Sequence, residues 1–355
     1  MPVSILARTQ PIHVAYGGAH LFKASTCKKL GELARKAAAA YDLQAALGLS
    51  DEVAARVSEK LDREPVEDFR IDFEDGFGIR PDAEEDAAAI NAAREIKTAT
   101  LPRQCGIRVK AGPRGFRTLH LFLDNVGGSL PENFVVTLPK VASVSDVTAL
   151  VEVLPPQIGV ELMVETPQAV LHLRELVDAC EGRCVGAHFG AYDYLASLGI
   201  AQQDLLHPAC DFARSHMLLQ LAGTGVWLSD GATNVLPLKG SNVQEAWKLH
   251  YHNTRRALYN GFYQGWDLHP AQIPARYAAV FSFFDEGMEA ASARLRNFVA
   301  MAAQATHVGG VFDDAATGRV LLNYFRRALA CGLAADLLPL VEDLEALLKF
   351  DAGNH

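Results

Sequence analysis

Short runs rich in β-branched and aromatic residues alternate along this chain with longer stretches in which apolar residues recur every three or four positions. Eight such runs occur, each leading into glycine or polar residues: 12–17, 68–75, 105–111, 133–141, 158–166, 183–190, 225–231 and 261–270. Runs of this length and composition are typical of strands. Strands that alternate with helices form a parallel sheet, so the pattern predicts an α/β fold.

The stretches between the runs predict helices. Residues 27–43 and 82–99 are rich in strong helix formers. Residues 144–154, 166–180 and 242–260 carry apolar residues at spacings of three and four. Eight strand–helix units favour a closed (β/α)8 barrel over an open doubly wound sheet. The lack of a GxGxxG motif after the first run also weakens the dinucleotide-binding alternative.

The last part of the chain has a different pattern. Beyond about residue 275 it is helical, with an interruption at the Gly- and Asp-rich segment 309–319. We therefore predict two parts. The first is a catalytic (β/α)8 barrel over residues 1–274, and the second is an appended C-terminal helical extension over 275–355 that serves as a lid or an oligomer contact.

Composition narrows the class of partner. The chain has 355 residues, half of them hydrophobic, a formal net charge of −9 and a mean hydropathy of +0.07. It has no basic block, so neither nucleic acid nor an anionic membrane surface is an expected partner. No uninterrupted apolar run is long enough to span a membrane, and the N-terminus does not resemble a signal peptide. Six scattered cysteines without a CxxC pair indicate reduced thiols in a cytoplasmic protein.

Two carboxylates follow neighbouring predicted strands. Glu165 and Asp193 come just after the fifth and sixth runs, and a helical segment joins these runs. Parallel neighbours have their carboxyl ends side by side, so the two acids could share one hard cation. Several carboxylates and few histidines at the strand ends suit Mg²⁺ or Mn²⁺ better than zinc. We predict a metal site at Glu165 and Asp193, with a solvated pair as the alternative.

The second and third runs carry charged residues on the side that faces the barrel interior. A period of two places Arg70, Asp72 and Glu74 on one face of the second run, and Arg108 and Lys110 on one face of the third. A guanidinium beside a metal suits the carboxylate of a 2-oxo acid, whose carbonyl the metal polarises as a Lewis acid. Asp72 either contacts this substrate or, like Arg70, forms a structural ion pair.

Four further residues at predicted strand ends are candidates for the site. Lys140 follows the fourth run as a substrate-binding, electrostatic or structural lysine, and a Schiff base is the alternative. Asp230 ends the seventh run and could contact a substrate hydroxyl. His20 follows the first run as an acid–base group or a loop cap. His269 follows the eighth run and either binds substrate or holds its loop.

Six short motifs occur in order within residues 68–272: DFEDG (72–76), RVK (108–110), LPKV (138–141), VETP (164–167), GAYDY (190–194) and DLHPAQ (267–272). Together they resemble the HpcH/HpaI aldolase and citrate lyase β-subunit superfamily. The resemblance implies a TIM barrel, Mg²⁺ held by Glu165 and Asp193, and Arg108 bound to the substrate carboxylate. It also implies that Glu74 and Asp75 lie close to the water molecules of the metal.

Members of that superfamily make or break carbon–carbon bonds in 4-hydroxy-2-oxo acids or in malyl-, citramalyl- or citryl-thioesters. They often form trimers or hexamers in which the C-terminal segment covers a neighbouring site. This chain departs from the pattern at Lys110, where thioester-cleaving members usually carry Asn, and at the first loop, YGGAHLF (16–22). The tail resembles the lid motif only loosely, with Asp313 or Asp314 as the candidate acid.

These observations predict a metal-dependent carbon–carbon lyase, or a synthase in reverse, for a small 2-oxo or hydroxy acid or its CoA thioester. The base that removes the hydroxyl proton stays open among a water at the metal, His20 and the Glu74/Asp75 pair. Two alternatives stay open as well. The same metal site could hydrolyse an acyl-CoA thioester, or the barrel could bind a carboxylate without catalysis.

Overall fold

The computed structural model describes residues 9–128, 130–240, 242–308 and 315–352. The chain divides into two compact units, one spanning Pro11–Tyr277 and the other combining the residues before Pro11 with Ala278–His355. The catalytic role predicted for residues 1–274 and the lid or oligomer role predicted for 275–355 stay predictions. Asp313 and Asp314 lie outside the described residues.

The first unit is a closed barrel of parallel strands that pair in chain order, with β1 returning to β8. The strands are β1 His13–Gly18, β2 Asp68–Asp72, β3 Gln104–Arg108, β4 Phe134–Leu138, β5 Gly159–Val164, β6 Cys184–Phe189, β7 Trp227–Asp230 and β8 Gln264–Asp267. Each strand overlaps one of the eight runs predicted from the sequence, and β1 and β3 extend one residue beyond theirs. The (β/α)8 TIM barrel is therefore confirmed, and the open sheet is excluded.

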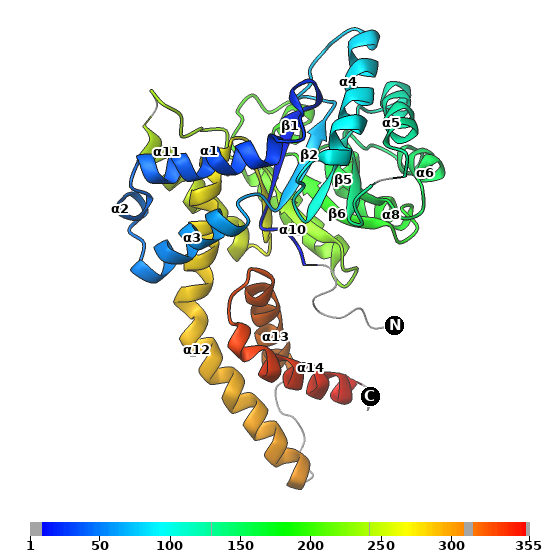
Figure 1. Ribbon diagram of the computed structural model, residues 1–355. Helices are drawn as coiled ribbons and strands as arrows, with labels where there is room; N and C mark the ends of the chain where they lie inside the picture. The colour runs from blue at the N-terminus through cyan, green and yellow to red at the C-terminus, as the bar shows by residue number, and fades with distance from the viewer. Residues whose placement is uncertain (1–8, 129, 241, 309–314, 353–355) are drawn as a thin grey trace. The chain divides into compact units, whose positions relative to one another are not determined.

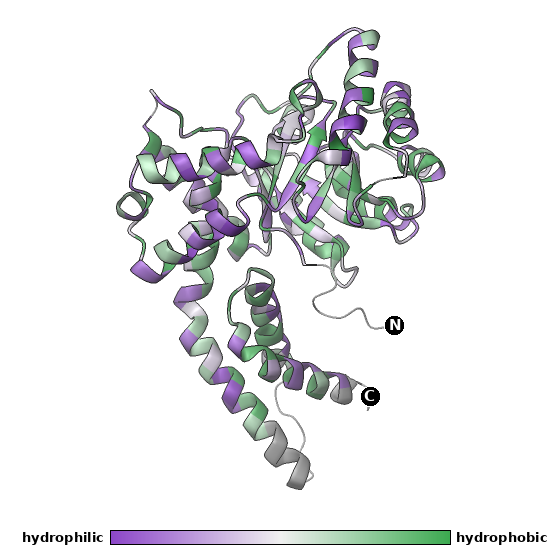
Figure 2. Ribbon diagram, in the orientation of Figure 1, coloured by the Kyte–Doolittle hydropathy of each residue, from purple (hydrophilic) through white to green (hydrophobic). Residues whose placement is uncertain are grey.

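Helices surround these strands (Figure 1). They are α1 Thr26–Ala40, α2 Leu43–Leu47, α3 Asp51–Arg63, α4 Asp82–Glu95, α5 Pro113–Val126, α6 Val144–Val153, α7 Pro167–Leu171, α8 Leu173–Asp178, α9 Ala191–Ser197, α10 Pro208–Leu221 and α11 Val243–Tyr259, with 3-10 turns η1 Ala19–Leu21, η2 Ile96–Thr98 and η3 Pro270–Gln272. Figure 2 shows hydrophobic and hydrophilic residues mixed along the outer helices, as expected for helices with one face buried against a core.

The structure adds helices that the sequence reading missed. One of them is α3, which buries Val53, Val57 and Leu61 at a spacing of four and begins where the Ser50 side chain accepts a hydrogen bond from the Val53 amide. The helices α5, α9 and α10 were also not predicted. The single helix predicted over 166–180 is divided into α7 and α8 at His172.

Part of the barrel interior is ionic. The Arg70 side chain, which is fully buried, contacts Asp68, donates from Nε to Thr137 Oγ1 at 3.0 Å, and donates from Nη2 to Glu161 Oε2 at 3.1 Å. Burial raises the pKa of Asp68 to about 6, although Arg70 opposes this shift. Because each of these polar groups has a partner, the network fits the structural ion pair predicted for Arg70.

The second unit is helical. It contains most of α12 Ile273–Val308, then α13 Ala315–Ala330, η4 Ala335–Leu337 and α14 Leu338–Ala352. Its described core comprises Leu295, Leu321, Leu322, Phe325, Leu337, Val341 and Leu344. Among the residues that the structure describes, no helix combines the length and apolar character needed to cross a membrane.

Candidate active site

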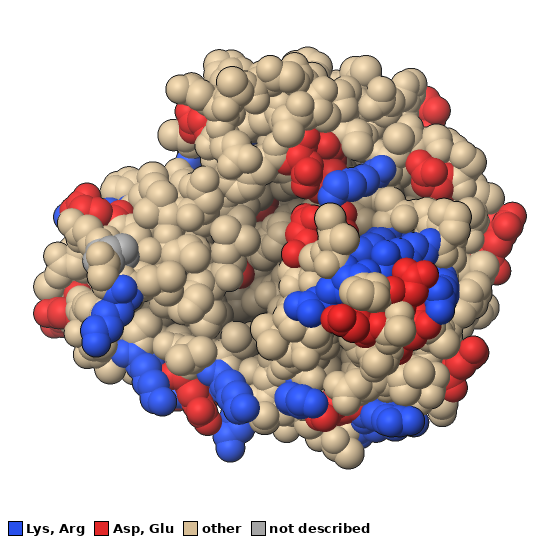
Figure 3. Space-filling model, turned by 90° about the horizontal axis from the view of Figure 1, so that it is seen from above, with Lys and Arg blue, Asp and Glu red and all other residues tan. Residues whose placement is uncertain are grey.

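The predicted site residues gather at the carboxyl ends of β2 to β6. The turn after β2 carries Glu74 and Asp75, β3 ends in Arg108, Lys140 follows β4, and Glu165 follows β5. Seen from above, the molecule is hollowed near its centre, and charged side chains gather along one side of the hollow (Figure 3). The carboxyl end of a barrel of this kind is where binding and catalytic side chains are usually found.

Arg108 is held by a carboxylate in the plane of its guanidinium. Its Nε donates to Asp72 Oδ1 at 2.7 Å, and its Nη2 donates to the other oxygen of the same side chain. Asp72 also accepts from the backbone amides of Glu74 at 2.9 Å and Gly76 at 2.7 Å, which fixes the turn after β2. Asp72 therefore forms a structural ion pair, and its contact with substrate stays a prediction.

The other edge of the guanidinium faces a second acid. Arg108 Nη1 lies 3.0 Å from Glu74 Oε2 and 3.7 Å from Asp75 Oδ2. Only 1% of Arg108 is exposed, and Glu74 lies against this edge of its guanidinium. The sequence predicted Arg108 at a strand end and offered an ion pair as one role of Asp72, but it did not identify Arg108 as the partner of Asp72 or of Glu74.

Two aromatic rings pack against the guanidinium of Arg108. Neither was predicted from the sequence to belong to the site. The guanidinium carbon lies 4.9 Å from the ring centroid of Tyr16 on β1 and 5.3 Å from that of Trp266 on β8. The Tyr16 hydroxyl donates to Glu161 Oε1 at 3.2 Å. The available signal was the period of two along β1, which places Tyr16 on the same face as Gly18. Cation–π contacts of this kind help to fix a guanidinium.

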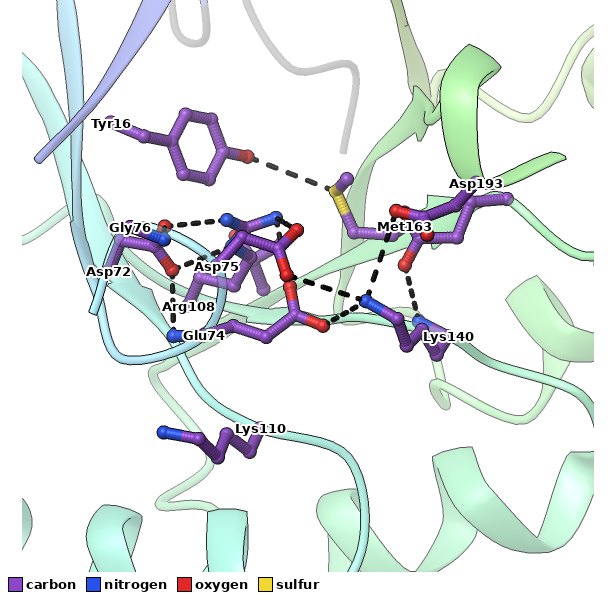
Figure 4. A network of polar contacts seen from close by, with 12 residues as sticks. Tyr16, Asp72, Glu74, Asp75, Gly76, Arg108, Lys110, Lys140, Met163 and Asp193 are labelled. Atoms are coloured by element: carbon purple, nitrogen blue, oxygen red, sulfur yellow. Dashed lines mark hydrogen bonds and ion pairs between the residues drawn. The ribbon is translucent and has the colours of Figure 1, made fainter. Parts of the chain in front are cut away.

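Lys140 lies among the acids (Figure 4). Its Nζ forms an ion pair with Glu74 Oε1 and lies 3.8 Å from both Asp75 Oδ1 and Asp193 Oδ2. Its backbone amide donates to Glu165 Oε1 at 2.6 Å. The φ of Lys140 is +52°, a left-handed conformation that is uncommon for a residue with a side chain. One strained residue therefore brings four acids together, and non-glycine residues in this conformation concentrate at functional sites.

Glu165 has few donors for a buried acid. Only 2% of the residue is exposed. Burial and the nearby Glu74 carboxylate raise the pKa of Glu165 to about 7, although Lys140 opposes the shift. The packing behind it is tight, since a Cβ at Gly190 would lie 2.5 Å from Glu165 Oε2. A further positive charge beside Glu165 would therefore stabilise its ionised form.

The acids fit a Mg²⁺ site with open positions. In the part of the chain that the structure describes, no three His, Cys, Asp or Glu side chains are arranged as a metal cage. Mg²⁺ rarely uses such a cage, because it is commonly held by one or two carboxylates and keeps several water molecules. Glu165 and Asp193 both contact Lys140, through its amide and its ammonium. The raised pKa of Glu165 and these oxygen donors suit a hard cation.

The remaining predicted residues have local partners. Asp230 accepts from Arg214 Nε at 2.9 Å and from the Gly231 amide at 2.8 Å. His269 Nδ1 accepts from the Ala271 amide at 3.1 Å at the start of η3, so His269 holds its loop. The substrate contacts predicted for both residues stay predictions.

His20 and Lys110 flank the turn after β2. The exposed His20 lies in η1, with its ring centroid 5.5 Å from that of Phe77. Burial and then Arg80 lower the pKa of His20, which favours a neutral imidazole. Lys110 Nζ donates to the Phe73 carbonyl and to Glu85 Oε2 at 2.8 Å, and Figure 4 shows it apart from the Lys140 group. Lys110, which stands where thioester-cleaving members usually carry Asn, thus stabilises the turn after β2.

Comparison with solved structures places the chain among barrels of one kind. It is similar to a citrate lyase from Burkholderia xenovorans LB400, with 19% identity, a TM-score of 0.61, and coverage of 93% of this chain and 96% of that chain. It is also similar to CitE from Mycobacterium tuberculosis in complex with magnesium, acetoacetate and coenzyme A, with 19% identity, a TM-score of 0.53, and coverage of 90% and 97%.

A third similar structure is malate synthase from Haloferax volcanii in a magnesium and glyoxylate complex. It has 14% identity, a TM-score of 0.52, and coverage of 77% of this chain and 76% of that chain. These neighbours are of the superfamily that the sequence motifs resemble, and at such identities the likeness is one of fold. No curated protein matches the sequence. Residues 6–338 match the model of a family described as a domain of unknown function (DUF6986), and the chain belongs to that family.

Proposed function

We propose that this chain is a Mg²⁺-dependent carbon–carbon lyase, or synthase in reverse, acting on a 2-oxo or hydroxy acid or its CoA thioester. The observation that carries the proposal is the group of acids, Glu74, Asp75, Glu165 and Asp193, joined by Lys140 beside the buried guanidinium of Arg108. A cation site next to a carboxylate site is what a chelating oxo acid requires.

Glu165 and Asp193 would hold the cation. When bound, Mg²⁺ supplies Lewis-acid polarisation of the substrate carbonyl and stabilises the negative charge that develops as the carbon–carbon bond breaks. The Lys140 amide orients Glu165, since it donates to Oε1. Gly190 leaves the space in which the Glu165 carboxylate lies.

Arg108 would bind the substrate carboxylate through the edge formed by Nη1 and Nη2. Its other edge stays with Asp72, so the guanidinium is oriented before substrate arrives. The substrate carboxylate replaces Glu74 beside Nη1, and Glu74 is thereby released toward the substrate hydroxyl. Burial raises the pKa of Glu74, and this shift makes it a better proton acceptor than an exposed carboxylate. Glu74 is accordingly our choice for the base, ahead of the exposed His20.

The fold neighbours support the substrate class without defining it. Their complexes hold magnesium with acetoacetate and coenzyme A in one protein and with glyoxylate in another. The acids and the arginine of this chain stand at the end of the barrel where such ligands bind in this type of fold.

The activity test uses purified protein, Mg²⁺, and a panel of 4-hydroxy-2-oxo acids and malyl- or citramalyl-thioesters. Release of pyruvate or glyoxylate is the expected result. Free thiol without carbon–carbon cleavage would instead identify the thioester hydrolase. Metal-dependent binding of these compounds without turnover would identify a carboxylate-binding protein.

The metal is tested separately. Glu165→Gln should weaken Mn²⁺ binding, followed by electron paramagnetic resonance, by about 100-fold or more. It removes a charged ligand, and even the loss of an outer-shell partner of a metal ligand costs about 10–100-fold. Glu175→Gln is the matched control, since Glu175 is an exposed acid on α8, and it should leave the affinity unchanged. Equal Mn²⁺ affinity in Glu165→Gln and the wild type, with unchanged circular dichroism, would refute the metal site.

A further inference from the structure

Among the residues that the structure describes, the ion-pair partner of Asp193 is Lys140, whose Nζ lies 3.8 Å from Asp193 Oδ2. It also forms an ion pair with Glu74 and lies within ion-pair distance of Asp75, while its own amide holds Glu165. A single ammonium therefore stands where several negative charges converge. That is also the location where the proposed function needs a divalent cation.

We propose that the Lys140 ammonium is a tethered competitor of the divalent cation, which must displace it from Asp193 in order to bind. This inference rests on the proposed function, because it takes Glu165 and Asp193 as the ligands. It assigns to the Lys140 ammonium the role of a competitor at the metal site, in place of a Schiff base or a substrate contact.

Charge supports the competition. An ammonium 3.8 Å from Asp193 stabilises that carboxylate, and a cation bound to the same carboxylate would be repelled by the ammonium. Backbone geometry supports it as well. The left-handed conformation of Lys140 directs its amide to Glu165 while its side chain reaches Glu74, so the amide contact can persist when the ammonium leaves.

The side chain has room to move. Lys140 is 40% exposed and Asp193 is 46% exposed, so the ammonium can turn to solvent without breaking a packed core. Its four-carbon stem is flexible and its charge is well hydrated in water. Arg108 differs in this respect, since it is buried and held by Asp72 at Nε and Nη2. Displacement by a cation is therefore a property of Lys140 and not of its cationic neighbour.

The test measures Mn²⁺ affinity by electron paramagnetic resonance for the wild type, Lys140→Met, Lys140→Arg and Lys248→Met. Lys140→Met removes the charge but keeps a side chain of similar length with the same backbone requirement. We expect it to bind Mn²⁺ about three- to tenfold more tightly, the effect of removing a few partly exposed ion pairs. Lys140→Arg and Lys248→Met should stay within about twofold of the wild type, since Lys248 is similarly exposed and its ion pair is with Glu245 on α11.

The Mn²⁺ affinities distinguish a failure of the inference from a failure of the proposed metal site. If the wild type binds Mn²⁺ and Lys140→Met binds it equally or more weakly, the inference is wrong and the proposed metal site stands. If neither protein binds Mn²⁺, the proposed function loses its metal and the inference is lost with it.

A second measurement uses the wild type alone. Limiting acetic anhydride labels exposed amines, and mass spectrometry compares Lys140 with Lys110 in the same sample. Labelling of Lys140 relative to Lys110 should rise when Mn²⁺ is added, because the ammonium leaves its carboxylates. A constant or falling ratio in Mn²⁺-bound protein would overturn the proposal.

Discussion

Asp267 and Glu165 are two buried acids at the carboxyl ends of barrel strands, with 1% and 2% of the residue exposed. Asp267 ends β8. Arg276 Nε donates to its two oxygens at 2.8 and 3.0 Å, and His250 Nε2 and His13 Nδ1 lie 2.8 and 3.1 Å away. Glu165 follows β5, and it accepts from the Lys140 amide and has acids nearby. The two acids are equally buried, but Asp267 has several charged or hydrogen-bonding partners and Glu165 has few.

The pKa values of the two acids differ accordingly. Burial alone would raise the pKa of Asp267, but Arg276 and the two histidines hold it well below its ordinary range. Burial and Glu74 raise the pKa of Glu165 to about 7. A buried acid with many donors stabilises the fold, whereas a buried acid whose pKa stays raised despite a nearby ammonium is suited to bind a further cation.

The largest expected effect comes from removing the satisfied acid. Asp267→Asn should lower the free energy of unfolding by about 3–5 kcal/mol, because Arg276 would be left buried without its counter-charge. Urea unfolding monitored by circular dichroism measures the change. Asp178→Asn is the control, since it breaks an exposed pair with Arg174 and should cost less than about 0.5 kcal/mol. Equal costs for the two variants would contradict the stabilising role assigned to Asp267.

A somewhat smaller effect is expected in the pH dependence of stability, measured with a chelator present. The folded-state pKa of Glu165 lies above the ordinary value of 4.5, so its stabilising contribution is complete below pH 4.5 and is lost as the pH rises through about 7. The loss is at most about 3 kcal/mol. Asp267 acts in the opposite direction, with a contribution present above its ordinary pKa and lost as the pH falls through its folded-state value.

Unfolding of the wild type and of Glu165→Gln between pH 4.5 and 8 isolates the Glu165 contribution. The free energy of unfolding of the wild type should decline relative to the variant over this range. A constant difference would mean that Glu165 is ionised in the folded protein as easily as in the unfolded chain.

The smallest effect concerns the space beside Glu165. A Cβ in Gly190→Ala would lie 2.5 Å from Glu165 Oε2 and 2.6 Å from its Cβ, so the acid must move. We expect a cost of about 1–3 kcal/mol in unfolding free energy and weaker Mn²⁺ binding. Gly186→Ala on β6 is the control, because its added Cβ would meet Glu161 at an ordinary 3.4 Å. Mn²⁺ affinity that is unchanged by Gly190→Ala would argue against Glu165 as a ligand.

The sequence was sufficient to predict the barrel and its rim. Runs rich in β-branched and aromatic residues that lead into glycine or polar residues identify each strand. The polar strand ends place Arg108, Lys140 and Glu165 at the same end of the barrel. Such features are local and can be read from a few neighbouring residues. The helix α3 was not predicted although its buried residues Val53, Val57 and Leu61 recur every four positions.

Partner choice could not be read in the same way. Asp72 meets Arg108 because β2 and β3 pair with these two residues opposite each other, and that register is a property of the assembled sheet. The placement of Tyr16 beside Arg108 also depends on how distant strands come together. The left-handed backbone of Lys140 has no signal in composition, since lysine does not favour that conformation.

At Lys140 the course of the backbone and the charge of the site can be changed independently of each other. Glycine and asparagine adopt the same backbone conformation at lower cost, so either could replace Lys140 with its amide still directed at Glu165. The loop would keep its course while the group of acids lost one positive charge. The electrostatic character of this site can therefore be altered by a single substitution, with no need to redesign the scaffold that presents it.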